Sequence, residues 1–211
     1  RFGQGQDFLE EPFPGDPELY RYTIVAMHQA RAIACANRGL AEQAIRERGM
    51  AADALAKVPE DWMVFNNTAE DVLKIGEAMM DGEIAFKAGR TEEGLDHLRR
   101  SVELDDNLLY DEPWAWMQPA RHALGALLME AGQFDEAEAV YRADHGLDDP
   151  LSRPSQHPRN VWSLHGLHEC LVQRGEYVEA KHLKLLLDQA VARATVPIRA
   201  SCYCRAKTKA A

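Results

Sequence analysis

The sequence lacks a long apolar run, a basic patch and every common catalytic motif. Its longest apolar stretches, such as 123–129, are far shorter than the roughly 20 residues that cross a bilayer, so a membrane-spanning helix is excluded. The 24 Lys and Arg are outnumbered by 34 Asp and Glu and gather into no run, so a nucleic-acid partner is not expected. No nucleotide-binding glycine loop, nucleophile-elbow serine or His-Glu-x-x-His pair occurs, and we therefore predict no catalytic residues.

Cysteine is also scarce, with four in 211 residues, which is ordinary usage for a reducing compartment. We interpret Cys35 and Cys170 as buried core thiols. Cys202 and Cys204 stand two residues apart near the C-terminus and need a separate explanation. The first residue is Arg1 rather than Met, so a targeting segment could precede it, and the cytoplasm is only the default expectation.

A repeated pair of small residues indicates the fold. Four times, a Gly that follows an amphipathic stretch is itself followed five residues later by Ala or Gly. The pairs are Gly39/Ala44, Gly89/Gly94, Gly132/Ala137 and Gly175/Ala180. In a tetratricopeptide repeat the Gly ends the first helix in a left-handed conformation, and the small residue lets the second helix pack closely. Since 46% of the residues are hydrophobic, enough for a continuous core, we predict an all-α chain that forms one globular unit.

The expected architecture is an α-solenoid of about four tetratricopeptide-like helical hairpins with long connections. The third copy resembles the repeat most closely, since Leu124, Gly125, Leu128 and Tyr141 fall on its spacing. The turn glycines are 50, 43 and 43 residues apart rather than ~34, so the connections carry insertions, which are often functional. The expected segments are an extended arm (1–16), a helical domain (17–200) with hairpins at about 17–57, 68–104, 117–145 and 160–195, and a Cys-x-Cys tail (201–211).

Three segments resemble a family of tetratricopeptide proteins of bacteria and fungi. They are Tyr-Asp-Glu-Pro-Trp-Ala-Trp-Met-Gln-Pro-Ala-Arg-His-Ala-Leu-Gly-Ala-Leu-Leu from Tyr110, Asn-Val-Trp-Ser-Leu-His-Gly-Leu-His-Glu-Cys-Leu from Asn160, and Ser-Cys-Tyr-Cys-Arg from Ser201. The resemblance covers roughly residues 60–205 and brings no established activity with it. It implies only that the three segments belong to one shared site or one shared structural need.

Counting back from each turn Gly predicts which side chains line the inner groove of such a solenoid. The positions ten residues back hold Gln29, Met79, His122 and His165, and those six residues back hold Ile33, Glu83, Ala126 and Glu169. Together with an aromatic and Arg-containing stretch, they give the predicted ligand-groove residues Met79, Glu83, Trp116, Arg121, His122, Trp162, His165 and Glu169. We expect this groove to hold a protein segment or a small ligand of basic or mixed character, without catalysis.

Some of the same side chains support a second hypothesis, a metal site for zinc, copper or iron. Imidazole, carboxylate and thiolate are donors that these ions accept. The candidate ligands are His122, His165, His168, Glu169, Cys202 and Cys204, provided that the tail folds back over the last hairpin. In the alternative reading these side chains bond a peptide or one another, and His168 is buried with a partner. No cofactor other than such a transition metal is expected.

A third hypothesis makes the chain a fixed subunit of a larger assembly. The long connections hold Trp62, Trp114 and Trp116, which either form docking surfaces or only pin the connections onto the hairpins.

Overall fold

The computed structural model describes residues 5–148 and 151–205, and the all-α fold predicted from the sequence is confirmed. The helices are α1 (Gly5–Glu10), α2 (Arg21–Asn37), α3 (Ala41–Leu55), α4 (Ala69–Lys87), α5 (Thr91–Asp106), α6 (Ala120–Ala131), α7 (Phe134–His145), α8 (Val161–Arg174) and α9 (Tyr177–Val191). A 3-10 turn, η1 (Arg153–Ser155), and a short strand pair, β1 (Met63–Val64) and β2 (Asn67–Thr68), lie between helices. No helix in these two described ranges is long and apolar enough to cross a membrane.

The chain divides into two compact units. One, which we call the N-terminal unit, ends at Ala120, and the other, the C-terminal unit, begins at Arg121. The sequence pattern placed both in one helical domain of 17–200. The division falls at the first residues of α6, and the connection 107–119 belongs with the N-terminal unit because it is bonded to an earlier connection of that unit.

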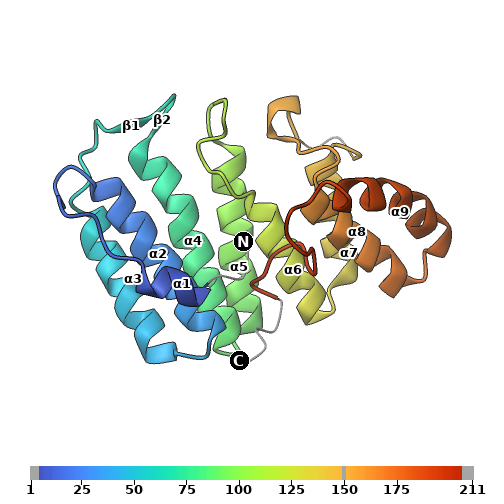
Figure 1. Cartoon of the computed structure of the whole chain (residues 1–211), viewed down its shortest axis with the longest axis horizontal. Helices are drawn as coiled ribbons and strands as arrows, with labels where there is room; N and C mark the ends of the chain where they lie inside the picture. The colour runs from blue at the N-terminus through green and yellow to red at the C-terminus, as the bar shows by residue number, and fades with distance from the viewer. Residues whose placement is uncertain (1–4, 149–150, 206–211) are drawn as a thin grey trace. The chain divides into compact units, whose positions relative to one another are not determined.

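In the N-terminal unit the helices form two neighbouring hairpins. Helix α2 packs against α3, α4 packs against α5, and α2 also contacts α4 (Figure 1). In the C-terminal unit α8 packs against both α7 and α9. The side-chain oxygen of Thr68 accepts a hydrogen bond from Asp71 N at the start of α4, and that of Asn160 does the same for Trp162 N at the start of α8.

The glycine turns behave as the sequence predicted. Gly39, Gly89, Gly132 and Gly175 have φ values of 76°, 83°, 76° and 79°, in the left-handed region that favours glycine. The residue after Gly39 donates its N–H to Cys35 O at 2.9 Å, and the residue after Gly89 donates to Ala85 O at 3.0 Å. These bonds satisfy carbonyls that the ends of α2 and α4 would otherwise leave unpaired, so each turn both ends a helix and caps it.

The small residues after these turns allow close helix packing, also as predicted. Ala44, Ala137 and Ala180 are buried. A Cβ on Gly94 would lie 2.7 Å from Phe86 N, so α4 and α5 approach backbone to backbone. In the C-terminal unit the ring of Tyr141 fills the space between α6 and α8, since a Cβ on either Gly125 or Gly166 would lie 2.5 Å from its Cε1.

Two long connections of the N-terminal unit bind each other, which the sequence did not predict. Asn67 accepts a hydrogen bond from Leu109 N at 2.7 Å and donates to Leu109 O at 2.9 Å and to Asp111 Oδ2 at 2.6 Å. Asn66 N donates to Asp111 Oδ1 at 2.9 Å. Strands β1 and β2 pair antiparallel and present Asn66 and Asn67 for these bonds. We call this set, Asn66, Asn67, Leu109 and Asp111, the clasp.

The N-terminal arm differs from the extended segment expected for 1–16. Residues 5–10 form α1, which packs on α2 in Figure 1, and Leu9 contacts the buried cluster of Cys35, Ala36 and Ala44. Burial of this apolar side chain stabilises a helix that is too short to form alone. Residues 1–4 of the arm and 206–211 of the tail lie outside the described residues.

Candidate functional site

The C-terminal unit brings together residues from the three segments that carry the family resemblance. Residues 200–205, which we call the closing segment, return to α6, α7 and α8. The Tyr141 hydroxyl on α7 lies 2.6 Å from Ser201 Oγ, which in turn donates to the carbonyl of His122 on α6 at 3.2 Å. Since Ser201 Oγ bonds this carbonyl rather than the imidazole, the contact is structural and does not resemble the activation of a nucleophilic serine.

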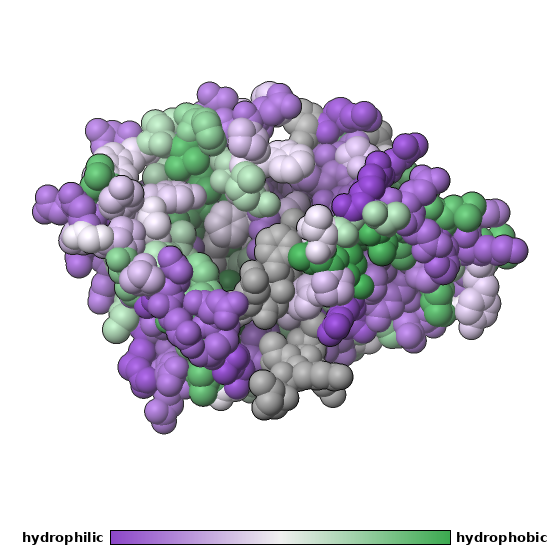
Figure 2. Space-filling model, viewed as in Figure 1, coloured by the Kyte–Doolittle hydropathy of each residue, from purple (hydrophilic) through white to green (hydrophobic). Residues whose placement is uncertain are grey.

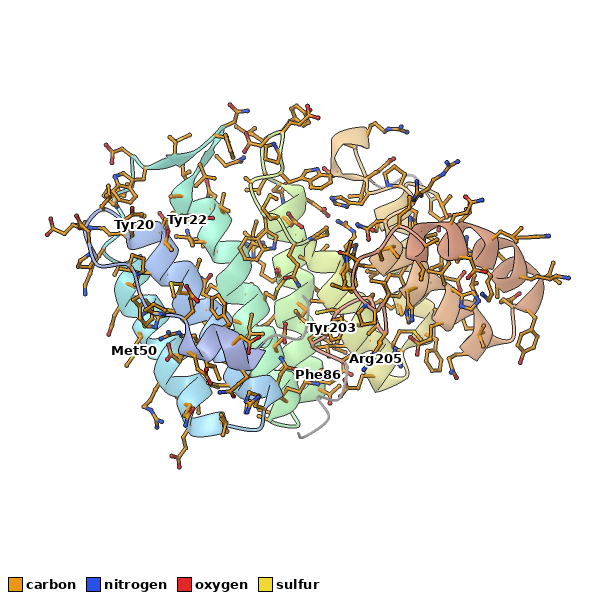
Figure 3. The ribbon with its side chains drawn as sticks, in the orientation of Figure 1. Tyr20, Tyr22, Met50, Phe86, Tyr203 and Arg205 are labelled. Atoms are coloured by element: carbon orange, nitrogen blue, oxygen red, sulfur yellow. The ribbon has the colours of Figure 1, made fainter. Side chains whose placement is uncertain are left out.

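Two further contacts hold the closing segment against α8. Arg205 donates to both carboxylate oxygens of Glu169, at 2.6 and 2.7 Å, and the rings of Tyr203 and Trp162 meet edge to face with centroids 6.1 Å apart. Figure 3 labels Tyr203 and Arg205, which project from the same short segment. A bidentate pair of this kind fixes geometry as well as charge. Glu169, predicted as a groove and metal residue, therefore anchors the closing segment.

His122, predicted to line the groove, is 0% exposed and lies in a buried hydrogen-bond network. Its Nε2 donates to Asp144 Oδ2 at 3.0 Å, and His157 Nδ1 donates to Asp144 Oδ1 at 2.8 Å. Burial opposes ionisation of Asp144, but the two imidazoles outweigh it and lower the pKa of that carboxyl. The network joins α6, the end of α7 and the connection before α8 into one interior.

The remaining histidines of this unit have less complete partnerships. Burial lowers the pKa values of His145 and His165, which favours their neutral forms. Among the described atoms, His145 Nε2 and His165 Nδ1 are buried without a hydrogen-bond partner. His168, expected to be buried with a partner, is partly exposed.

The predicted metal ligands do not converge as a set of three or more within this unit. In its described residues, no three His, Cys, Asp or Glu side chains place ligand atoms within 4.8 Å of one another. Cys202 and Cys204, however, are both buried and reduced, and their sulfurs lie within that distance of each other. The pair is thus the part of the predicted set that the structure brings together.

In the N-terminal unit, Met79 and Glu83 lie on α4 and are buried. Burial raises the pKa of Glu83 to about 7, and the bond that Asn37 Nδ2 donates to its Oε2, at 2.6 Å, only partly offsets this rise. Gln29 on α2 donates to Leu73 O at 2.9 Å, but its Oε1 has no partner among the described residues.

Trp116 lies against the same part of α4. A Cβ on Gly76 would lie 2.9 Å from Cη2 of this ring, so the glycine makes room for it. Its Nε1 is buried and, in the described part of the chain, has no hydrogen-bond partner. The tryptophan pins its connection onto the helices, which was one of the two roles that the sequence left open.

Most predicted groove residues are therefore interior residues. Arg121 and Trp162 are buried as well as Met79, Glu83 and His122, whereas Trp116, His165 and Glu169 are partly exposed. A ligand could reach the buried five only after local opening. Counting back from each turn glycine identified equivalent helix positions, but most of the side chains there are buried in the protein interior and do not line an open groove.

Several large apolar side chains are exposed on the two connections that the clasp joins. Phe65 is 64% exposed, and Leu109 and Met117 are each 65% exposed, far above what a side chain pinned to the core would show. Figure 2 shows green apolar side chains at the surface near the start of α4, where these connections lie. The exposed set, which we call the clasp surface, is Met63, Phe65, Leu109, Tyr110, Trp114 and Met117.

The clasp surface is bordered by negative charge. Glu60 and Asp61 precede β1, and Glu112 follows Asp111; all three of these side chains are exposed. Between positions 102 and 118 the sequence contains five acidic residues and no Lys or Arg. The surface thus combines an apolar centre with an acidic rim.

A pocket of about 420 Å³ opens elsewhere in the N-terminal unit, where α2, α3, α4 and α5 come together. Its charged walls are largely paired with each other. Arg48 binds both carboxylate oxygens of Asp81 at 2.6 and 3.0 Å, and Arg90 binds Glu93 at 2.8 Å. These pairs leave the pocket with little charge to attract a ligand.

Comparison with protein-family models, with curated proteins and with solved structures found no match for this chain. The candidate surfaces therefore rest on geometry and chemistry.

The sequence reasoning missed Asp144, His157 and the clasp residues. Asp144 carried a usable signal, because it lies seven residues after Ala137 and three after Tyr141, on the face that packs into the unit. His157 and the clasp residues lie in or beside connections, where no helical period indicates a partner.

Proposed function

We propose that this chain is a non-catalytic, tetratricopeptide-like binding module, and that its clasp surface holds a segment of a partner protein. The observation that carries the proposal is the exposure of several large apolar side chains on two connections that are bonded to each other. Large exposed apolar patches mark interaction sites in soluble proteins.

The clasp gives this surface the order that binding requires. Phe65 lies directly before Asn66, and Leu109 exchanges two hydrogen bonds with Asn67, so the exposed side chains of both connections flank the same bonds. Burying one such side chain in a complex contributes about 1.5–3 kcal/mol before the costs of association. A surface that is already ordered loses less conformational entropy on binding than a flexible loop would.

The acidic rim indicates the chemistry of the partner. A segment with apolar side chains flanked by Lys or Arg would fill the centre and pair with Glu60, Asp61 and Glu112. An anionic membrane surface would be repelled by the same charges. We therefore propose a basic, amphipathic protein segment as the ligand, which agrees with the basic or mixed partner expected from the sequence.

The proposal keeps the binding role expected from the sequence but moves it from the inner groove to the connections. It also accommodates the reading of the chain as a subunit of an assembly, since the partner segment could belong to a permanent neighbour.

The test uses nuclear magnetic resonance on the full chain with two synthetic 14-residue peptides of identical apolar content, one rich in Lys and one rich in Glu. We expect the Lys peptide to shift the indole N–H signal of Trp114 and the amide signals of residues 63–65 and 109–117. Added salt should weaken the binding of this peptide. The Phe65→Ser/Leu109→Ser variant should lose at least about tenfold in affinity.

The matched control is Val178→Ser/Leu185→Ser, which removes two comparably exposed apolar side chains from α9. It should bind as the wild type does. Equal binding of both peptides, shifts centred on α9, no shift at all, or an unchanged affinity of Phe65→Ser/Leu109→Ser would each contradict the proposal.

A further inference from the structure

The hairpin of β1 and β2 turns at a residue whose backbone conformation is unfavourable for its side chain. Val64 pairs with Asn67, so Phe65 and Asn66 form a two-residue loop. Both turn types that close such a hairpin need a positive φ at the first loop residue, where glycine, asparagine or aspartate is preferred. Phe65 stands there with a φ of 55°, although the Cβ of a bulky L-residue crowds the backbone in this region.

The ring of Phe65 gains little inside the chain in return. Its side chain is 64% exposed, and Figure 1 shows β1 and β2 beyond the start of α4. Residues held in unfavourable backbone conformations persist where their surroundings fix them, and they cluster at binding sites. The ring is therefore placed for a contact outside the chain.

The clasp supplies the bonds that fix this conformation. Asn66 donates its backbone N–H to Asp111 Oδ1 at 2.9 Å and its side-chain NH2 group to Tyr110 O at 2.7 Å. Asn67 donates to Asp111 Oδ2 at 2.6 Å. Both residues that follow Phe65 are thus bonded to the connection after α5, and the ring is held outward before a partner arrives.

The hairpin offers a partner side chains rather than a sheet edge. Ala69 N donates to Trp62 O at 2.8 Å, so in the antiparallel register the N–H and C=O of Met63 point away from β2. Val64, the other residue of β1, turns its backbone groups toward β2. A single outward-facing residue gives too few main-chain hydrogen bonds to hold an added strand. Recognition at this hairpin therefore depends on side chains.

We propose that Phe65 is the anchor of the clasp surface and that its ring enters the recess between successive turns of an amphipathic helix in the partner. This inference rests on the binding role proposed for that surface. On one face of a helix, apolar side chains at i, i+3, i+4 and i+7 form a hole that accepts a projecting side chain, whereas an extended segment presents a flatter row. Lys or Arg beside the hole would pair with the acidic rim. A few anchors of this kind carry most of the binding energy of an interface.

The binding test compares two Lys-rich peptides of equal length and composition. One has leucines at i, i+3, i+4 and i+7, and the other has leucines at alternate positions. The full chain should bind the peptide with helical spacing at least about tenfold more tightly, and Phe65→Gly should lose at least about tenfold in affinity for it. Nuclear Overhauser effects should join the Phe65 ring of the wild type to these leucines.

Thermal melts distinguish an anchor from a residue that supports the fold. Glycine adopts a positive φ without crowding, so Phe65→Gly should melt at the temperature of the wild type or up to about 4 °C higher. The matched control is Arg159→Gly in the C-terminal unit, which replaces the other described residue besides glycine that has a positive φ, 59°. Arg159→Gly should melt in the same range and bind the helical peptide as the wild type does.

Three results would overturn this inference alone, with the binding role of the clasp surface intact. They are a Phe65→Gly variant that binds as the wild type does, a Phe65→Gly variant that melts at a lower temperature, and equal or tighter binding of the alternating peptide. A wild type that binds neither peptide would overturn both the anchor role and the binding role on which it rests.

Discussion

The two units are built from similar helical hairpins, but the buried carboxyl group of each unit has different partners. Each has helical hairpins whose first helix ends at a left-handed glycine and whose helices pack through small residues. The N-terminal unit buries an acid, Glu83, which accepts a hydrogen bond from the neutral amide of Asn37. The C-terminal unit buries an aspartate between two histidines. The two units thus share their helical packing, but ionisation of the buried carboxyl group should affect the stability of each unit differently.

The largest expected effect tests the aspartate of the C-terminal unit. In Asp144→Asn the amide can accept from one imidazole but turns its NH2 group toward the other donor. Removing the charge from such a buried network should lower the free energy of unfolding by about 3–5 kcal/mol, measured by urea denaturation. Asp188→Asn breaks only an exposed pair with Lys184 and should cost less than about 1 kcal/mol. A similar cost for both variants would contradict the comparison.

Removing the charge of Glu83 in the N-terminal unit should stabilise the protein, whereas removing that of Asp144 should destabilise it. Because the pKa of Glu83 is raised from 4.5 to about 7, the folded state binds the extra proton between these values, and stability falls as pH rises through them. Glu83→Gln should therefore unfold like the wild type near pH 4 but be more stable at pH 8, by about 3 kcal/mol. Denaturation at both pH values measures this difference.

Glu77→Gln, on the same helix, is the control for Glu83→Gln: it retains Glu83 and should therefore keep the pH dependence of the wild type. Equal pH slopes for wild type and Glu83→Gln would show that Glu83 ionises normally.

The shared helical packing should respond alike in both units. The new methyl of Gly94→Ala meets backbone atoms of Phe86 and Gly82 within 2.8 Å, and that of Gly166→Ala meets the buried ring of Tyr141. Each change should cost about 1–3 kcal/mol. Gly49→Ala meets nothing within 4 Å in the middle of α3 and should instead stabilise by up to about 1 kcal/mol. Thermal melts rank the three, and a neutral Gly94→Ala would show that α4 and α5 can separate freely.

The last comparison separates the units by pH alone. On acidification from pH 8 to 5, the N-terminal unit gains stability through Glu83. The pKa values of His145 and His165 are lowered by burial, so below about pH 6.5 protonation favours the unfolded form of the C-terminal unit. Hydrogen exchange, corrected for its intrinsic dependence on pH, should show amides of α4 better protected and amides of α8 less protected. A change of the same sign in both helices would contradict the contrast.

Features that depend on residues close together in the sequence could be predicted, whereas features that depend on contacts between distant residues could not. The left-handed glycine and the small residue five positions later act within one turn, so the hairpin turns were predictable. The position of His122 on its helix was predictable too, but its burial depended on Asp144 and on His157, which comes from a connection. The exposure of Phe65 and Leu109 likewise depends on side-chain to backbone bonds between loops 42 residues apart, which no period encodes.

The clasp also has a consequence for how the chain can be altered by recombination. Asn67 satisfies both backbone groups of Leu109, and Asp111 accepts the backbone N–H of Asn66, so each connection completes the hydrogen bonding of the other. Exchanging one connection alone with that of a related protein would leave backbone groups of its neighbour without partners, at about 1–3 kcal/mol for each group that stays buried. The two connections are therefore expected to be inherited, lost or grafted as a pair, and a chimera that carries both should fold better than one that carries either alone.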